Sequence, residues 1–318
     1  MGRRTLDLPD AADIADTFLR VEKFVPSSPL LASPFAGKDC WLKLESLQRT
    51  GSFKIRGATA ALTKIPQGEN IVTCSAGNHG LAVAVVAKEL GIKATIVVSQ
   101  KASPKKIELL RKETEDLIVH GIDYDEAEDF ARELAESRNV RYLSPYNDPD
   151  VILGQASVGV ELLSSFSGPI TVVCPIGGGG LAAGIGMALS FRPGSRLIGV
   201  EAANSAPMKL ALDRGETVPI DIFPTIAEGL AGNLERGSIT VGLLSKYSES
   251  TLAVTESQIR DGMKYLALHH GIVTEGAGSV AMAAILAGEF PFPKGQPLIA
   301  LVSGRNIDLD TWKGFLES

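Results

Sequence analysis

The sequence predicts an α/β fold with two lobes, each a mainly parallel open sheet covered by helices. Three observations lead to this prediction. Short apolar runs alternate with longer helical segments, glycine-rich turns lie where strands give way to helices, and 45% of the 318 residues are hydrophobic, enough for a full core. A chain of this length forms either one large α/β unit or two lobes.

The first half of the chain repeats a strand and a helix three times. An apolar run at 71–74 predicts a buried strand, and 81–91 predicts a helix ending at Gly91, a residue type favoured at helix C-termini. The repeats continue as a strand at 94–98, a helix at 104–112, a strand at 116–120 and a helix at 123–138. Strands joined by helices run parallel, so this half predicts a parallel sheet with helices on both faces.

The second half follows the same pattern. It predicts a strand at 171–174, a helix at 181–191, strands at 197–201 and 298–302, and a loop over the polar, glycine-containing stretch 214–236. Ligands of parallel sheets bind outside the carboxyl ends of the strands. Two such lobes would therefore hold their ligand in the cleft between them.

Charge and composition exclude several classes of partner. The net charge is −6 and no basic stripe stands out, which argues against nucleic acid and anionic membranes. No apolar run reaches transmembrane length, and no secretory h-region opens the chain. Cys40, Cys74 and Cys174 are odd in number and far apart, so we expect reduced core thiols and a cytoplasmic protein.

The segment 52–58 places Lys54 at the start of a helix, between Phe53 and small residues. A lysine in such a position stays partly desolvated, which lowers its pKa and makes its amine a nucleophile toward a carbonyl. Most lysines are instead solvated surface residues. Two further turns in the chain, described next, support the interpretation of Lys54 as a reactive lysine.

Four consecutive glycines lie between a predicted strand and a predicted helix: Gly177, Gly178, Gly179 and Gly180. Their backbone can turn tightly and direct several N–H groups one way, and the helix adds a positive dipole end, so the turn suits a phosphate. The spacing is not a dinucleotide fingerprint, and a Walker lysine is absent. The alternative is a turn that is merely tight.

A second strand-to-helix turn, 75–80, also combines small and polar residues. Backbone N–H groups there can hold a carboxylate, and Ser75, Asn78 and His79 add polar groups. The alternative is helix capping by Ser75 or Asn78. Ser303 ends the last predicted strand, where it would meet a ligand in the crevice unless the segment is a plain turn.

Together these motifs resemble the fold-type II pyridoxal-phosphate enzymes of the tryptophan synthase β family, and within it the threonine/serine dehydratases and serine racemases. The resemblance spans 42–306, with the motifs in the family order. It implies pyridoxal 5'-phosphate as cofactor in the cleft between the lobes. The implied cofactor contacts are Lys54 as the Schiff-base lysine, Phe53 before it, Asn78 at the ring hydroxyl, 177–180 at the phosphate and Ser303 at the pyridine nitrogen. The implied grip on the substrate carboxylate is Ser75, Ala76, Gly77, Asn78 and His79.

The resemblance also implies an activity. The freed amine of Lys54 takes the α-proton, the cofactor is the electron sink, and a 3-hydroxy amino acid such as threonine or serine loses water to give a 2-keto acid and ammonia. The implied assembly is a homodimer, with a large cofactor-anchoring domain of 1–69 and 146–318 and a small, mobile substrate-binding domain of 70–145. Little chain follows Asn306, so we expect no C-terminal regulatory domain. A non-catalytic phosphate- or nucleotide-binding protein is the alternative from another class.

Three positions depart from the family pattern. Ala76 stands where serine racemases carry a serine that acts as a base on the second face, which favours a dehydratase over a racemase. Glu201 matches a family metal ligand, but Ala206 and Pro207 stand where its acidic partner would be, so we expect no metal. Arg305 stands where the family more often has a small residue. It would pair with the second carboxylate of 3-hydroxyaspartate, or with a larger 3-hydroxy amino acid, unless it points to solvent.

Overall fold

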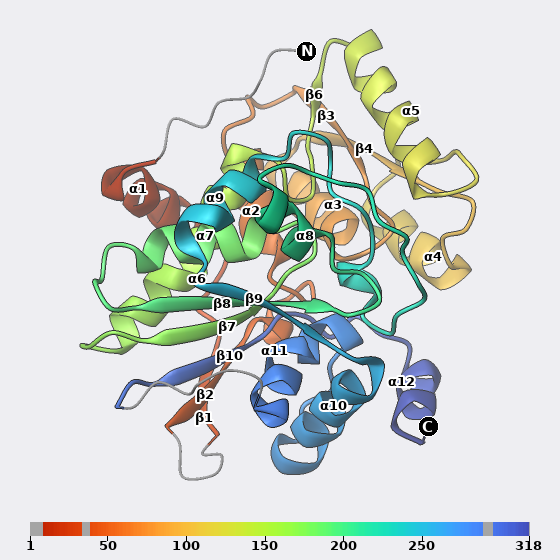
Figure 1. Ribbon diagram of the computed structural model, residues 1–318. Coiled ribbons are helices and arrows are strands. Elements are labelled where there is room, and N and C mark those ends of the chain that lie inside the picture. Colours follow the sequence, from red (N-terminus) through yellow and green to blue (C-terminus); the bar gives the residue numbers. More distant parts are fainter. Residues whose placement is uncertain (1–8, 34–38, 289–294, 318) are drawn as a thin grey trace.

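Two separate sheets organise the chain (Figure 1). The computed structural model describes residues 9–33, 39–288 and 295–317. Within them, the larger sheet has the strand order β1-β2-β10-β7-β8-β9 and the smaller sheet the order β5-β4-β3-β6. The predicted fold class, two mainly parallel sheets covered by helices, is confirmed.

The smaller sheet is entirely parallel. Its strands and the helices between them are β3 (Asn70–Cys74), α3 (Asn78–Leu90), β4 (Lys93–Val98), α4 (Pro104–Glu113), β5 (Leu117–Val119), α5 (Tyr124–Ser137) and β6 (Arg141–Tyr142). Because side chains alternate along a strand, Ile71 packs in the core on the α3 side, whereas Val72 packs with Ala127 and Ala131 of α5. Both faces of this sheet are therefore covered.

The larger sheet is parallel except at one edge, where β1 pairs antiparallel with β2. Its strands are β1 (Leu30–Ala32), β2 (Cys40–Leu44), β7 (Thr171–Pro175), β8 (Arg196–Ala202), β9 (Ser250–Val254) and β10 (Leu298–Val302). Val172 and Ile299 pack against α6 (Pro149–Ser165) and α7 (Gly180–Leu189). Val173 and Ala300 face the opposite layer, which contains α10 (Glu256–His270) and α11 (Gly276–Ala287). Figure 1 shows these two helical layers on either side of the strands.

The remaining elements connect or flank these layers. They are α1 (Ala11–Glu22), the 3-10 turn η1 (Glu45–Leu47), α2 (Lys54–Leu62), α8 (Pro207–Arg214), the 3-10 turn η2 (Glu228–Leu230), α9 (Ile239–Tyr247) and α12 (Leu309–Glu317). The stretch 214–236, expected to be a loop, contains only η2 beyond the end of α8. No helix among the described residues combines the length and apolar character needed to cross a bilayer.

The largest difference from the predicted helices lies at the start of α3, and α7 ends at Leu189, two residues before the predicted end at 191. α3 begins at Asn78, three residues before the predicted start at 81, and ends before Gly91, whose φ is +68°. Gly80 explains the early start, because a Cβ there would lie 2.0 Å from the carbonyl oxygen of Ser75. Only glycine lets the first helical turn fold this closely over the preceding backbone.

All three cysteines are buried, and Cys74 and Cys174 are free thiols. Burial raises the pKa of Cys74 to about 12, and it also raises the pKa of Cys174. Both therefore remain protonated at neutral pH and serve as small core residues.

Candidate active site

A cavity of about 1090 Å³ lies where strand ends of the two sheets face each other. Its walls include the residues after β3, after β7 and after β10, as expected for the carboxyl ends of parallel strands. The structure brings together in this one cavity nearly every residue that the sequence singled out. These are Phe53, Lys54, Ser75, Ala76, Gly77, Asn78, His79, Gly177, Gly178, Gly179, Gly180, Ser303 and Arg305.

Lys54 is the first residue of α2, and its amine faces the cavity. Its Nζ donates a hydrogen bond to the carbonyl oxygen of Pro145 at 2.8 Å and lies 5.2 Å from the centre of the Phe53 ring. Burial lowers the pKa of Lys54 to about 8, although the charge of Glu275 acts in the opposite direction. A far larger fraction of this amine is therefore neutral and nucleophilic near neutral pH than in an ordinary lysine.

The glycine loop needs glycine for packing as well as for its turn. Gly179 has a φ of +86°, and a Cβ at Gly178 would lie 2.2 Å from the ring of Tyr146. Thr240 Oγ1 fixes the loop by donating to the carbonyl oxygen of Gly178 at 2.8 Å. The first-turn N–H groups of α7, which starts at Gly180, have no partner within the helix. The loop thus offers a phosphate both backbone donors and the positive end of a helix.

The turn before α3 places its backbone on the same cavity. Ser75 Oγ accepts from the N–H of Gly77 at 3.2 Å, and the first-turn N–H groups of α3 follow directly. Burial and the charge of Lys54 lower the pKa of His79 to about 3. His79 is therefore neutral at physiological pH, and it lines the cavity as a polar group rather than acting as an acid.

The end of β10 is tied to the segment that carries Lys54. The N–H of Phe53 donates to the carbonyl oxygen of Ser303 at 3.1 Å, and Ser52 forms an antiparallel bridge with Gly304. Ser303 Oγ donates to the carbonyl oxygen of Ala277 at 3.3 Å. This long hydrogen bond leaves the lone pairs of the hydroxyl free, so Ser303 can form a hydrogen bond with a ring nitrogen of a ligand in the cavity.

Arg305 and Glu201 are already engaged by the protein. The guanidinium of Arg305 donates to the carbonyl oxygen of Ser46. The carboxylate of Glu201 accepts the N–H groups of Met208 and Lys209, both at 2.8 Å, and so caps α8. Burial raises the pKa of Glu201 to about 7. Glu201 does not line the cavity, and the described residues contain no group of three or more His, Cys, Asp or Glu side chains suited to a metal.

Two functional candidates were not identified from the sequence. Glu275 accepts a hydrogen bond from Asn78 Nδ2 at 2.7 Å, and Asn306 Nδ2 donates to Asn78 Oδ1 at 2.6 Å. Burial raises the pKa of Glu275 to about 7. The available signal was an acid directly before the small-residue run 276–279, which begins α11.

A charged cluster lies in the cavity wall beside Pro145, whose carbonyl oxygen accepts the hydrogen bond of Lys54. Arg132 Nη2 donates to Glu128 Oε1 at 2.5 Å and to Glu235 Oε2 at 2.9 Å. Glu235 also accepts from Ser144 Oγ at 2.5 Å and Asn147 Nδ2 at 2.8 Å. Burial raises the pKa of Glu128, while Arg132 opposes that effect. Two carboxyl groups sharing one guanidinium make this wall unfavourable for a further carboxylate.

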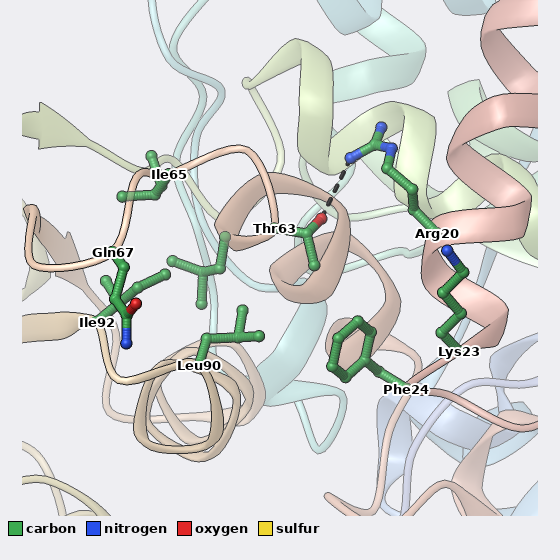
Figure 2. A pocket seen from close by; sticks show the side chains of 9 residues that line it. Arg20, Lys23, Phe24, Thr63, Ile65, Gln67, Leu90 and Ile92 are labelled. Carbon is green, nitrogen blue, oxygen red and sulfur yellow. Dashed lines mark hydrogen bonds between the residues drawn. The ribbon is translucent and has the colours of Figure 1, made fainter.

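A second, smaller cavity of about 350 Å³ lies between α1, the end of α2 and the end of α3 (Figure 2). Figure 2 shows Arg20 reaching across to Thr63, whose Oγ1 accepts from Arg20 Nη1 at 3.2 Å. The other lining residues are mainly apolar, and none belongs to the motifs found in the sequence. The chemistry of the molecule therefore lies in the larger cavity.

Comparison with known proteins agrees with this geometry. The family model of pyridoxal-phosphate dependent enzymes matches residues 21–304. L-threonine ammonia-lyase of Thermotoga maritima is 37% identical over 87% of this chain and 70% of its own length. The catabolic L-threonine dehydratase TdcB of Staphylococcus aureus is 34% identical over 99% and 94%. The solved structure of maize serine racemase superposes with a TM-score of 0.89 at 28% identity, covering 98% of each chain. The chain therefore belongs to the family of pyridoxal-phosphate dependent enzymes.

Proposed function

We propose that this protein is a pyridoxal-phosphate dependent ammonia-lyase that removes water from threonine or serine and yields a 2-keto acid and ammonia. The observation that carries the proposal is Lys54, an amine with a pKa of about 8 that faces the same cavity as the glycine loop. Relatives named L-threonine ammonia-lyase and L-threonine dehydratase, at 34–37% identity, support the choice of reaction.

The residues present fit the cofactor. Lys54 Nζ would hold its aldehyde carbon covalently, the N–H groups of 177–180 its phosphate, Ser303 its pyridine nitrogen and Asn78 its ring hydroxyl. Phe53 supplies an apolar contact at the side of the amine. When bound, the cofactor supplies an electron sink for the α-carbon of an amino acid. A neutral Ser303 suits elimination better than transamination, because it partners the ring nitrogen more weakly than a carboxylate would.

Lys54 is the group that moves the α-proton. With a pKa near 8, a free Lys54 amine would accept a proton and return it within the operating pH range. Ala76 provides only a methyl group, and His79, with its pKa lowered to about 3, does not hold a proton at this pH, so we assign no second base to the opposite face. One-face proton transfer favours a dehydratase over a serine racemase, which is the second candidate.

The proposed substrate is small. Backbone N–H groups of 75–79 would hold its carboxylate, as the first turn of α3 opens on the cavity. Arg305 lines the cavity and keeps 3-hydroxyaspartate or a larger 3-hydroxy amino acid as the alternative substrate. Its bond to Ser46 and the acidic wall of Glu128 and Glu235 favour threonine and serine instead.

The organisation of the molecule in the cell is part of the proposal. We assign 70–145 to a small, mobile substrate-binding domain, and 1–69 with 146–318 to a large cofactor-anchoring domain. The four strands of the smaller sheet lie within 70–142, which supports this division. Buried thiols support a reducing, cytoplasmic location. We propose a homodimer from the family resemblance. Light scattering, which measures the molar mass in solution, tests this assembly.

The decisive experiment is an assay of 2-keto acid and ammonia with L-threonine, L-serine and 3-hydroxyaspartate, with parallel chiral analysis of recovered serine. We expect equal release of keto acid and ammonia from threonine or serine, and no D-serine. A visible absorbance band that disappears on borohydride reduction would mark the lysine-bound cofactor. Rapid racemisation without keto acid would contradict the proposal, and so would activity confined to 3-hydroxyaspartate.

A further inference from the structure

Asn78 makes two side-chain contacts that cross from one sheet to the other. It begins α3, which covers the smaller sheet, whereas Glu275 directly precedes α11, and Asn306 follows β10 of the larger sheet. Asn78 Nδ2 donates to Glu275 Oε1 at 2.7 Å, and Asn78 Oδ1 accepts from Asn306 Nδ2 at 2.6 Å. Both ends of one amide are thus held by the opposite part of the molecule.

The partners fix which way the amide faces. The Asn78 atom opposite Glu275 Oε1 is the nitrogen, which donates to this carboxyl oxygen at 2.7 Å. Asn306 Nδ2 also donates to the carbonyl oxygen of Thr50 at 2.8 Å, so it uses both of its N–H groups as a donor. The Asn78 atom opposite Asn306 must then be the oxygen. One N–H of Asn78 Nδ2 remains for a ligand in the cavity.

Two glycines make room for this arrangement. A Cβ at Gly304 would lie 2.0 Å from Glu275 Oε1 and 3.3 Å from Asn78 Nδ2. A Cβ at Gly51, whose φ is +77°, would lie 2.1 Å from Asn306 Oδ1. The backbone of Glu275 is also tied to Gly304, since its N–H donates to the Gly304 carbonyl oxygen at 3.3 Å. The carboxylate and the second amide are therefore confined to the positions that orient Asn78.

We propose that Glu275, assisted by Asn306, is a positioning residue for the cofactor, because it sets the amide of Asn78 so that its free N–H points to the cofactor ring. Glu275 acts through Asn78, with which it shares a hydrogen bond. The inference rests on the proposed contact between Asn78 and the cofactor. It explains why the amide of Asn78 would present its N–H, and not its oxygen, to the cofactor. The same contacts link the two sheets next to the cofactor.

The test is a double-mutant cycle on the holoenzyme, read as the rate at which bound pyridoxal 5'-phosphate is lost on dilution into excess scavenging apoprotein. No substrate is added, so the result is independent of the reaction catalysed. We expect Glu275→Ala to speed cofactor loss about ten- to a hundredfold, the range for losing one hydrogen bond to a charged group. Glu275→Gln, which can still accept from Asn78, should restore most of the retention.

The cycle is completed in the Asn78→Ala background. If Glu275 acts through Asn78, then Glu275→Ala adds less than about a twofold change there, because the two effects are not additive. Glu228→Ala is the matched control: Glu228 lines the same cavity and pairs with Lys106 at 2.9 Å, and it should give the same small change in both backgrounds.

Two results would overturn the inference. An equal effect of Glu275→Ala in both backgrounds would mean that Glu275 holds the cofactor or the fold without Asn78. An Asn78→Ala enzyme that retains cofactor like the wild type would remove both the proposed ring contact and the role of Glu275. Thermal unfolding of the cofactor-free variants checks the fold, and if Glu275→Ala does not fold, the same cycle is run with Glu275→Leu, which fills the space but cannot accept from Asn78.

Discussion

Lys54 and Arg56 stand two residues apart in α2, yet their surroundings are opposite. The amine of Lys54 faces the cavity and has one hydrogen-bond acceptor among the described contacts, the carbonyl oxygen of Pro145. Arg56 is fully buried and binds two carboxylates: Nε donates to Glu45 at 2.7 Å and Nη1 to Glu161 at 2.7 Å. Positions i and i+2 lie on different sides of a helix, so one turn of α2 serves two purposes.

The two surroundings move the two pKa values in opposite directions. Burial lowers the pKa of Lys54 to about 8, because little nearby negative charge compensates for lost water. The pKa of Arg56 is raised, because Glu45 and Glu161 outweigh the same burial effect, and the pKa of Glu45 is lowered by Arg56. Burial alone therefore does not decide whether a cation is reactive or structural. The number of paired carboxylates does.

The largest expected effect comes from removing the reactive cation. Lys54→Ala should lower kcat for threonine by a factor of at least about 10² to 10⁴, the range supplied by general-base catalysis. Its melting temperature without cofactor should equal or exceed that of the wild type, because a partly desolvated charge is removed. The measurement pairs the keto acid assay with thermal unfolding. A variant that keeps more than about a hundredth of wild-type kcat would rule out Lys54 as the base.

Removing the structural cation should give the reverse pattern. Arg56→Leu leaves Glu45 and Glu161 buried and deprived of their guanidinium, so it should cost about 3–5 kcal/mol of unfolding free energy. Arg49→Leu, which breaks the more exposed pair with Glu89, should cost less than about 1 kcal/mol. Chemical denaturation of the cofactor-free proteins measures both. Equal costs would contradict the distinction between a reactive and a structural cation in α2.

The pH dependence of stability should report Lys54 specifically. Without cofactor, the unfolded chain holds the Lys54 proton up to about pH 10.5, whereas the folded chain releases it above about pH 8. The unfolded state therefore binds more protons between these values, and stability due to Lys54 rises with pH across this window, by at most about 3 kcal/mol. Subtracting the curve of Lys54→Met isolates this contribution. Parallel curves for the two proteins would show that the pKa of Lys54 is not lowered.

The smallest effect is expected at Arg305, whose guanidinium has one hydrogen-bond acceptor among the described contacts, the carbonyl oxygen of Ser46. Arg305→Ala should change kcat/KM for threonine and for 3-hydroxyaspartate by similar factors, within about threefold of each other. One such hydrogen bond is worth about 1 kcal/mol or somewhat more. A loss confined to 3-hydroxyaspartate, tenfold or larger, would establish the carboxylate-binding role suggested by the sequence.

The sequence was sufficient where the signal is local. Strand-to-helix turns rich in glycine located the loop 177–180 and the turn before α3, and the alternation of elements predicted both sheets. Glu275 and Asn306 could not be found this way, because their meaning lies in contacts with Asn78 across large separations in the chain. Likewise, the charge of Arg305 and its position at a strand end could be predicted from the sequence, but its hydrogen-bond acceptor, the carbonyl oxygen of Ser46, could not. That depends on how η1 packs beside β10.

The tie between Phe53 and Ser303 joins the first sixth of the chain to its last strand. During synthesis the lysine segment leaves the ribosome long before β10, and contacts of such high sequence separation form late in folding. The backbone next to Lys54 therefore gains its Ser303 partner only after β10 has been synthesised. We expect that a nascent chain lacking β10 cannot retain the cofactor, and that cofactor capture therefore follows the synthesis of both distant segments.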